Sequence, residues 1–190
     1  MDKEQILKLF HELGDELSEE ESWATINVCG GAAMAIAYNN LKSSDDIDAV
    51  LTDFDDRNKF TECVKRVGER HGLPMNWLNE DVKVFVNSMR EHCFKDFGEF
   101  GALSVRIVSE EQLLAMKLLA ARKEKDLADC VNLAKILKIS TKEELHNILT
   151  KYFSERALNF EIRRSQNKMR FSDFEDDILD ILESGDFNAD

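Results

Sequence analysis

The chain has 190 residues, of which 43% are hydrophobic and 33% are charged, and its formal net charge at pH 7 is -13. This length allows one domain, or one domain with a helical extension, and the composition excludes a chain that is disordered throughout. The acidic balance gives no support to tight, non-specific binding of nucleic acid.

The first part of the chain predicts alternating helices and strands. Apolar residues at helical spacing predict an amphipathic helix that ends near Glu19. A β-prone run, 24–29, is stopped by Gly30 and Gly31, and helix-forming residues 32–37 follow. The simplest interpretation is a strand, a glycine turn and a helix.

A second strand is predicted from Asp46 to about Thr52, followed by a helix from Asp55 to His71 that Gly72 and Pro74 end. Beyond it we expect strands at 76–78, 82–86 and 103–108, and a loop at 94–101.

From Ser109 onwards almost every segment has helical periodicity, and Ser109 followed by Gln112 is typical of a helix start. The predicted fold class is therefore α/β (α+β), a mixed sheet flanked by helices with a helical C-terminal half. We expect a core over 1–108, a helical region packed on it over 109–171, and an acidic tail over 172–190.

The acidic tail carries eight of the acids and no Lys or Arg, and a basic stretch from Arg156 to Arg170 precedes it. Three interpretations of the tail are open: it folds over the basic stretch, it competes with a polyanion for that stretch, or it keeps the protein soluble. Solubility is the simplest of the three.

Four widely spaced cysteines without a CxxC pair predict packed, reduced thiols. The N-terminus is amphipathic and acidic, and no apolar run has the length that spans a bilayer, so we expect a cytoplasmic protein without a membrane partner.

Asp46 and Asp48 stand two residues apart on a predicted strand, so both carboxylates lie on one face. Mg²⁺ takes one or two protein carboxylates and completes its shell with water and substrate phosphates, so this pair predicts a site for a metal-bound nucleotide. Gly30 and Gly31 open a helix, where bare backbone N–H groups approach a phosphate. A plain turn and a solvated acidic edge are the structural alternatives for these motifs.

These motifs carry a resemblance. Residues 26–31 (Ile-Asn-Val-Cys-Gly-Gly) followed by 44–48 (Ser-Asp-Asp-Ile-Asp) resemble the signature of the DNA polymerase beta-type nucleotidyltransferase superfamily. The resemblance implies that Gly30 and Gly31 hold phosphate, with Ser44 as a further nucleotide contact, and that Asp46 and Asp48 bind Mg²⁺.

A narrower likeness is to minimal nucleotidyltransferase-like proteins related to AbiEii-type toxins, whose later helix carries Lys-x-x-Ala-x-Arg and downstream aspartates. Lys117 to Arg122, followed by Asp126 and Asp129, is similar to that motif. The resemblance implies that Lys117 and Asp126 contact nucleotide or help to activate the acceptor, with Arg122 as a further nucleotide contact. On one continuous helix Lys117 and Asp126 point apart, so joint action requires a break near 123–125. The structural alternative is an exposed helix with salt bridges.

The chain departs from the superfamily pattern at its third carboxylate, which belongs on a following strand. The candidates are Asn76, Asn79 and Asp81, and an Asn leaves no carboxylate to accept the acceptor's proton.

The leading prediction is a metal-dependent transferase that moves NMP from an NTP to an RNA, such as tRNA, or a protein, in a toxin–antitoxin or phage-defence system. The alternatives are a catalytically degenerate regulator or antitoxin that binds a nucleotide or a cognate partner protein, and a purely structural helical adaptor.

Overall fold

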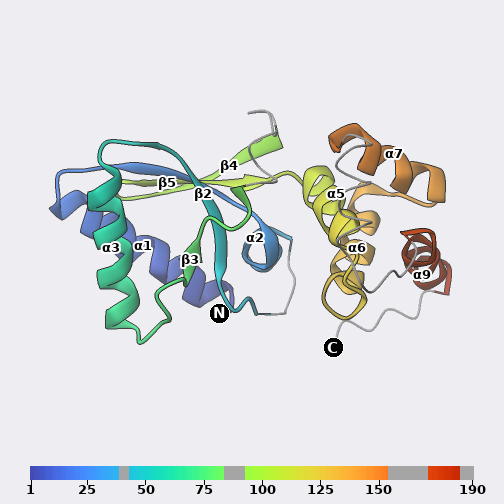
Figure 1. The fold of residues 1–190 in the computed structure, drawn as a ribbon, viewed down its shortest axis with the longest axis horizontal. Helices are drawn as coiled ribbons and strands as arrows, with labels where there is room; N and C mark the ends of the chain where they lie inside the picture. Colours follow the sequence, from blue (N-terminus) through green and yellow to red (C-terminus); the bar gives the residue numbers. More distant parts are fainter. Residues whose placement is uncertain (39–42, 84–92, 154–170, 185–190) are drawn as a thin grey trace. The chain divides into compact units, whose positions relative to one another are not determined.

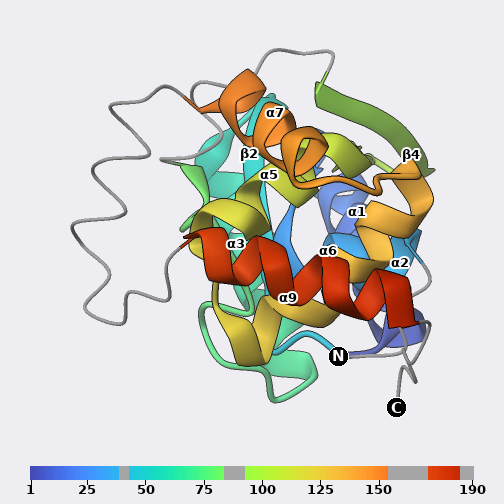
Figure 2. The same cartoon turned by 90° about the vertical axis from the view of Figure 1, so that its right-hand side faces the viewer.

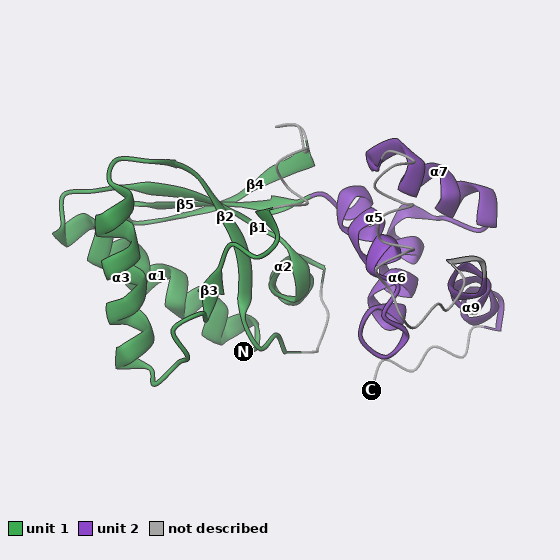
Figure 3. Ribbon diagram, in the orientation of Figure 1, with its two compact units in different colours: residues 1–108 green, residues 109–190 purple. Residues whose placement is uncertain are grey.

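A computed structural model of the chain describes residues 1–38, 43–83, 93–153 and 171–184. The chain divides into two compact units, 1–108 and 109–190, which Figure 3 shows in different colours. The described residues form seven helices and five strands (Figure 1). This confirms the predicted fold class, a mixed α/β chain with a helical C-terminal half.

Local sequence signals set the helices of unit 1. Helix α1 (Lys3–Glu19) starts at a capping box between Asp2 and Gln5, and buries the predicted apolar stripe. Helix α3 (Arg57–Arg70) starts at Asp56, whose side chain accepts hydrogen bonds from the N–H groups of two residues in its first turn. Helix α2 (Gly30–Ala37) is the exception, because it has no side-chain cap.

The sheet of unit 1 is mixed and has the strand order β3-β2-β1-β5-β4. Strand β1 pairs with β2 antiparallel and with β5 parallel. Strand β3 pairs with β2 in parallel over two residues, and β4 pairs with β5 antiparallel. The strands are β1 (Ala24–Val28), β2 (Ile47–Phe54), β3 (Leu78–Asn79), β4 (Phe94–Phe100) and β5 (Leu103–Val108).

One face of this sheet packs against helices α1 and α3, and the other carries several polar side chains. Ala49 and Leu51 of β2 lie beside Phe60 and Val64 of α3, and α1 contacts β4 and β5. Figure 1 shows α1 and α3 on the same side of the sheet. Because side chains alternate along a strand, Asp48 points to the opposite face. The register places Asn79 opposite Asp48, Asn27 opposite Val50 and Arg106, and Asp96 opposite Arg106.

Two local predictions in unit 1 are wrong. The segment expected to be a loop at 94–101 is the edge strand β4 with the start of its turn. Its exposed, charged residues and its irregularity between Asp96 and Gly98 are typical of an edge strand, and they hid its periodicity. The strand expected at 82–86 is also absent from its described part, because 81 and 82 form a turn and 83 is helical. Residues 84–86 lie outside the described residues.

Unit 2 consists of helices among the residues that the structure describes. The predicted start at Ser109 is confirmed, since its hydroxyl accepts a hydrogen bond from the Gln112 N–H. A capping box between Thr141 and Glu144 starts the third helix of the unit. The helices are α5 (Glu110–Ala120), α6 (Lys123–Leu137), α7 (Lys142–Tyr152) and α9 (Phe171–Ser184).

Most of the acids of the predicted tail lie on α9, which packs against α6 and α7. Figure 2 shows α9 running across α6. Phe174 and Ile178 are buried, while Asp177 pairs with Lys123 at 2.6 Å and Asp176 with Lys142 at 2.7 Å. The basic stretch 156–170 lies outside the described residues.

The four cysteines are free and buried, as predicted. Among the described helices, none combines the length and the apolar character that a membrane span requires.

Candidate functional site

The turn between β1 and α2 meets the aspartate strand. Gly30 has φ +62°, a conformation that L side chains rarely adopt, and a Cβ built on it would lie 2.4 Å from Asp48 Oδ2. The Cys29 N–H also donates to the Asp48 carbonyl oxygen at 2.8 Å. Glycine is therefore required twice at this position, for the backbone conformation and for the close approach of the Asp48 carboxylate.

The next glycine brings a third segment to the same corner. A Cβ on Gly31 would lie 2.7 Å from Ser44 Oγ, so its absence lets Ser44 pack against the first turn of α2. No side chain caps this turn, and the first N–H groups of a helix have no partner within the helix. These N–H groups and the helix dipole favour an anion such as phosphate. Gly30, Gly31 and Ser44 thus lie together, as their predicted roles require.

Two carboxylates and one amide follow on the neighbouring strands. Asp46 directly precedes β2 and Asp48 lies within it, while Asn79 on β3 is in register with Asp48. The Asn79 amide donates from Nδ2 to Asp46 Oδ2 at 3.1 Å. Asp46, Asp48 and Asn79 are all partly accessible to solvent. The structure therefore joins the predicted aspartate pair to Asn79 at one edge of the sheet.

The orientation of the Asn79 amide is fixed by its bonds. Its Oδ1 accepts from the Asp81 N–H at 2.9 Å, so its N–H group points to Asp46. Of the three candidates for the third carboxylate position, Asn79 is the one opposite Asp48, whereas Asn76 and Asp81 lie in turns. An amide N–H thus faces Asp46 at the place where a third carboxylate would face a shared cation.

The donor set fits a magnesium ion that shares its shell with a substrate. Within the described residues there is no group of three or more Asp, Glu, His or Cys that could hold a metal alone. Two carboxylates beside an uncapped helix start match Mg²⁺, which takes one or two carboxylates and completes its shell with phosphate oxygens and water. Asp46 and Asp48 are the residues that would hold it.

Cys29, beneath the corner, has no reactive role. Burial raises the pKa of its thiol to about 12, and the negative charge of Asp48 adds to the effect. The thiol is therefore protonated at neutral pH and packs as a small apolar group.

The second predicted motif forms a cluster of its own in unit 2. Lys117 Nζ donates to Asp129 Oδ2 at 2.6 Å and to Asp126 Oδ1 at 3.3 Å. Arg122 donates to both oxygens of Asp126, from Nε at 2.7 Å and Nη2 at 3.0 Å. The helix break that joint action of Lys117 and Asp126 requires is present, but it lies before 123–125, since Ala121 adopts a left-handed conformation between α5 and α6.

This charge cluster joins α5 to α6. The side chains of Lys117, Asp126 and Asp129 are at most 8% exposed, whereas Arg122 is 61% exposed. Burial lowers the pKa of Lys117, but Asp129 and Asp126 outweigh burial and raise it above its ordinary value. Two cations and two carboxylates thus neutralise one another, and the helix break lets Lys117 and Asp126 meet.

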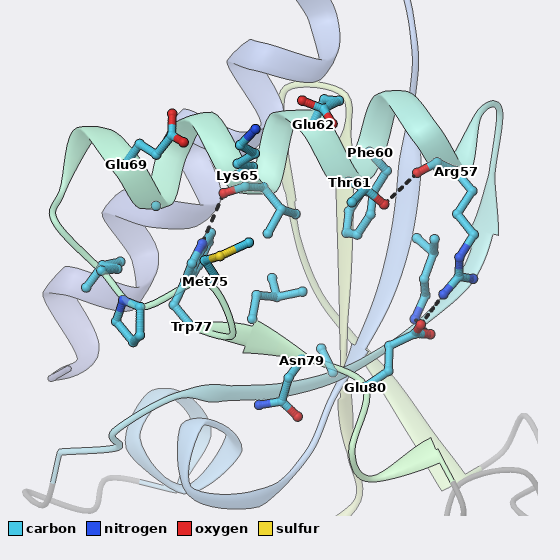
Figure 4. A pocket seen from close by; sticks show the side chains of 17 residues that line it. Arg57, Phe60, Thr61, Glu62, Lys65, Glu69, Met75, Trp77, Asn79 and Glu80 are labelled. Atoms are coloured by element: carbon cyan, nitrogen blue, oxygen red, sulfur yellow. Dashed lines mark hydrogen bonds and ion pairs between the residues drawn. The ribbon is translucent and has the colours of Figure 1, made fainter.

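A groove of about 510 Å³ lies between α3 and the β2–β3 edge (Figure 4). Some of its polar groups bond within the protein: Trp77 Nε1 donates to the Val64 carbonyl oxygen at 3.0 Å, and Arg57 pairs with Glu80. Figure 4 shows the Asn79 side chain pointing away from α3. The groove therefore meets the aspartate site at Asn79 but lies on the face of the sheet that α3 covers, opposite to Asp48.

Asn27 and Arg106 lie outside the sequence motifs, yet they share a face of the sheet with Asp48. Asn27 was visible as a polar residue inside an apolar strand, and that signal would have identified it. Arg106 required the register between β1 and β5, which sequence periodicity does not supply.

Comparison with known proteins places this geometry in a family. A model of the DUF6036 family, nucleotidyltransferases of unknown function, matches residues 4–180. No curated protein and no solved structure matches the chain. The match spans both units, including the glycine corner, the aspartate pair and the charge cluster. The chain belongs to the DUF6036 family of nucleotidyltransferases.

Proposed function

We propose that the protein is a Mg²⁺-dependent nucleotidyltransferase that moves NMP from an NTP to an RNA or protein acceptor. The observation that supports this most directly is the contact between Gly30 and the Asp48 carboxylate. It brings an anion-binding helix start and a pair of metal-binding carboxylates to one corner, which is what a metal-bound triphosphate requires. The family match supports a nucleotide substrate.

Each residue of the corner has a distinct role in this proposal. The N–H groups at Gly30 and Gly31 bind and orient the triphosphate, and Ser44 contacts it beside them. Asp46 and Asp48 would hold Mg²⁺, which when bound would neutralise charge on the phosphate oxygens. The acceptor hydroxyl attacks the α-phosphorus, the bond to the bridging oxygen of the β-phosphate breaks, pyrophosphate leaves, and the hydroxyl proton passes to a base or to water.

The setting that we propose is a toxin–antitoxin or phage-defence system in the cytoplasm, with tRNA as one acceptor and a cognate protein as a regulator. The support for it is the likeness of the Lys117–Arg122 motif and its aspartates to AbiEii-type toxins.

Transfer is tested by incubating the protein with each labelled NTP, Mg²⁺ and either total cellular RNA or lysate. We expect one NTP to label a macromolecule, with loss of the label in EDTA and in Asp46→Ala. Absence of label with every NTP, together with identical behaviour of wild type and Asp46→Ala, would contradict transfer.

A second candidate function is nucleotide binding without efficient transfer, as in a regulator or antitoxin. Asn79 favours it, because an amide in register with Asp48 offers neither a charged metal ligand nor a base for the acceptor's proton. Calorimetry separates the two functions, since tight NTP binding without any labelled product indicates a binding protein.

A further inference from the structure

The outer side of β3 is an edge of the sheet in unit 1. Strand β3 is last in the strand order, so among the described residues it has a neighbouring strand on one side only. The Ile47 N–H donates to the Trp77 carbonyl oxygen at 2.7 Å, and Ile47 is in register with Leu78. Because the main-chain groups of successive strand residues point to alternate sides, the N–H and C=O groups of Leu78 point away from β2. This edge therefore has a donor and an acceptor for a further strand.

The groove between α3 and β3 lies along this edge. Most of its lining is apolar, and this lining includes Leu51, Phe60, Val64 and Leu78. Met75, which also lines the groove, is 90% exposed. An exposed apolar surface beside an open strand edge is typical of a site that a partner protein covers.

The charges along the groove favour a basic polypeptide. Figure 4 shows Glu62, Lys65 and Glu69 on α3, and all three side chains are exposed. Neither glutamate forms an ion pair with a described residue, whereas Arg57 and Glu80 pair with each other. Two carboxylates therefore face the partner against one ammonium group. They repel the phosphates of RNA and complement Lys or Arg side chains.

A strand at this edge would reach both faces of the sheet. Leu78 lines the groove, and Asn79 points to the face that carries Asp48. Because side chains alternate along a strand, every second residue of an added strand lies in the groove, and the residues between them lie on the Asp48 face. Those residues are one strand spacing, about 4.8 Å, from Asn79 and two spacings from Asp48.

We propose that an extended segment of a partner protein adds to β3 as a further strand and is the acceptor of the transfer. Its alternate apolar residues fill the groove, and flanking Lys or Arg residues meet Glu62 and Glu69. A Ser, Thr or Tyr between two apolar residues faces the aspartate pair.

The transfer step itself is that of the proposed function, on which the acceptor role rests; the docking does not depend on it. The hydroxyl oxygen of the docked segment forms a bond to the α-phosphorus of the NTP. The bond from that phosphorus to the bridging oxygen of the β-phosphate breaks, pyrophosphate leaves, and the hydroxyl proton passes to water.

Docking is tested by selecting a random peptide library on the wild-type protein and titrating the selected peptides by calorimetry. We expect peptides with apolar residues at every second position and Lys or Arg at the ends. Leu78→Pro should weaken their binding about tenfold, because it removes the outward N–H and keeps the bond between Ile47 and Trp77.

A charge reversal tests the same surface without a change in the strand. Glu62→Lys combined with Glu69→Lys should also weaken binding of these peptides about tenfold. Asp15→Lys combined with Glu19→Lys is the matched control, because both residues are exposed on α1 outside the groove. It changes the net charge equally and should leave peptide binding as in wild type. A library that yields no binder, or peptides that bind all these variants as tightly as wild type, would overturn the docking.

The acceptor role is measured with labelled NTP, Mg²⁺ and lysate, using wild type and the Glu62→Lys, Glu69→Lys variant. We expect label on a protein hydroxyl between two apolar residues, located by mass spectrometry, and at least about tenfold less label from the variant at unchanged NTP binding. Label confined to RNA, or equal labelling of protein by both, overturns the acceptor role and leaves the nucleotide site intact. Wild type that binds no NTP overturns the proposed function, while the peptide titrations still decide the docking.

Discussion

The two motifs that the sequence suggested as functional differ in how their charges are arranged. In the unit 2 cluster, Lys117 and Arg122 face Asp126 and Asp129 within 3.3 Å, and the four charges neutralise one another. At the glycine corner, the Asp48 carboxylate lies against the backbone of Gly30, and Asp46 accepts a hydrogen bond from the Asn79 amide. The cluster holds two helices together, whereas the corner has negative charge and backbone donors for a ligand.

The difference separates two uses of charged side chains: pairing that stabilises the fold, and carboxylates that bind a ligand. A buried ion pair that meets its partner within the protein is costly to break, while solvent-accessible carboxylates are the usual protein ligands of Mg²⁺. We therefore expect substitutions in the cluster to act on folding and substitutions at the corner to act on nucleotide.

The largest effect is expected from Lys117→Met. It removes the buried cation that Asp126 and Asp129 share, and breaking a buried ion pair from one side destabilises a protein by about 3–5 kcal/mol. Urea unfolding followed by helix circular dichroism measures the loss. Adding Asp129→Asn should restore part of the stability, because it removes one of the uncompensated charges. Unchanged stability of Lys117→Met would show that the cluster is not structural.

Glu175 provides the opposite case within unit 2. Its Oε1 is buried without a hydrogen-bond partner among the described residues, and burial raises its pKa to about 7, against the attraction of Lys142. The folded state therefore binds the proton more tightly than the unfolded chain. This contribution to stability is complete below pH 4.5 and is lost as pH rises through 7.

We expect Glu175→Gln to remove up to about 3 kcal/mol of this pH dependence between pH 5 and pH 8. Parallel urea titrations of wild type and variant at both values measure it. Identical pH profiles for the two proteins would contradict the assignment to Glu175.

The next effect separates backbone strain from the Asp48 contact. Gly30 and Gly72 have nearly equal φ values, +62° and +61°, but a Cβ on Gly72 would meet nothing within 4 Å. Both Gly→Ala variants should lose about 1–2 kcal/mol to the left-handed conformation. Gly30→Ala should lose more, and it alone should weaken NTP binding, because it displaces the Asp48 carboxylate. Equal losses of stability and of NTP binding in the two variants would contradict the role of the Gly30–Asp48 contact.

The smallest effect sharpens the comparison at the corner itself. Asn79→Asp places a carboxylate oxygen opposite Asp46, so the two repel until a cation lies between them. We expect Mg²⁺ affinity to rise on the order of tenfold, or about 1.4 kcal/mol, and transfer to accelerate. Asn76→Asp is the matched control, because Asn76 is exposed in the preceding turn. A rise that is equal in both variants would indicate general charge rather than a site.

Local signals predicted much of this fold. A helix cap such as Ser109, a proline such as Pro74 and a glycine turn such as Gly30 each act on the backbone within a few residues. The helices and β1 could therefore be predicted from the sequence. Strand β4 did not, because its edge position removes the alternation that reveals buried strands. The face and register of β5, and therefore Arg106, depend on pairing across distant segments, which no local pattern encodes.

The candidate site was predictable in its parts and less so in its geometry. The spacing of Asp46 and Asp48 predicted their shared face, and Gly30 was expected near phosphate. Sequence alone could not show that Asp48 contacts Gly30 or that Asn79 takes the register position of a third carboxylate. The nucleotide role of the Lys117 motif stays a prediction, and sequence alone could not show that Lys117 pairs with the aspartates of the same motif.

The most direct test of the central claim is calorimetric titration of Mg²⁺-bound NTP into wild type, Asp48→Asn and Asp53→Asn. Asp48 and Asp53 lie on the same strand, but Asp53 is exposed near its far end and accepts a hydrogen bond from the Phe54 N–H. We predict one binding site in wild type and in Asp53→Asn, and at least about a tenfold loss in Asp48→Asn. Equal binding by all three proteins would contradict the claim that the glycine corner and Asp48 hold a metal-bound triphosphate.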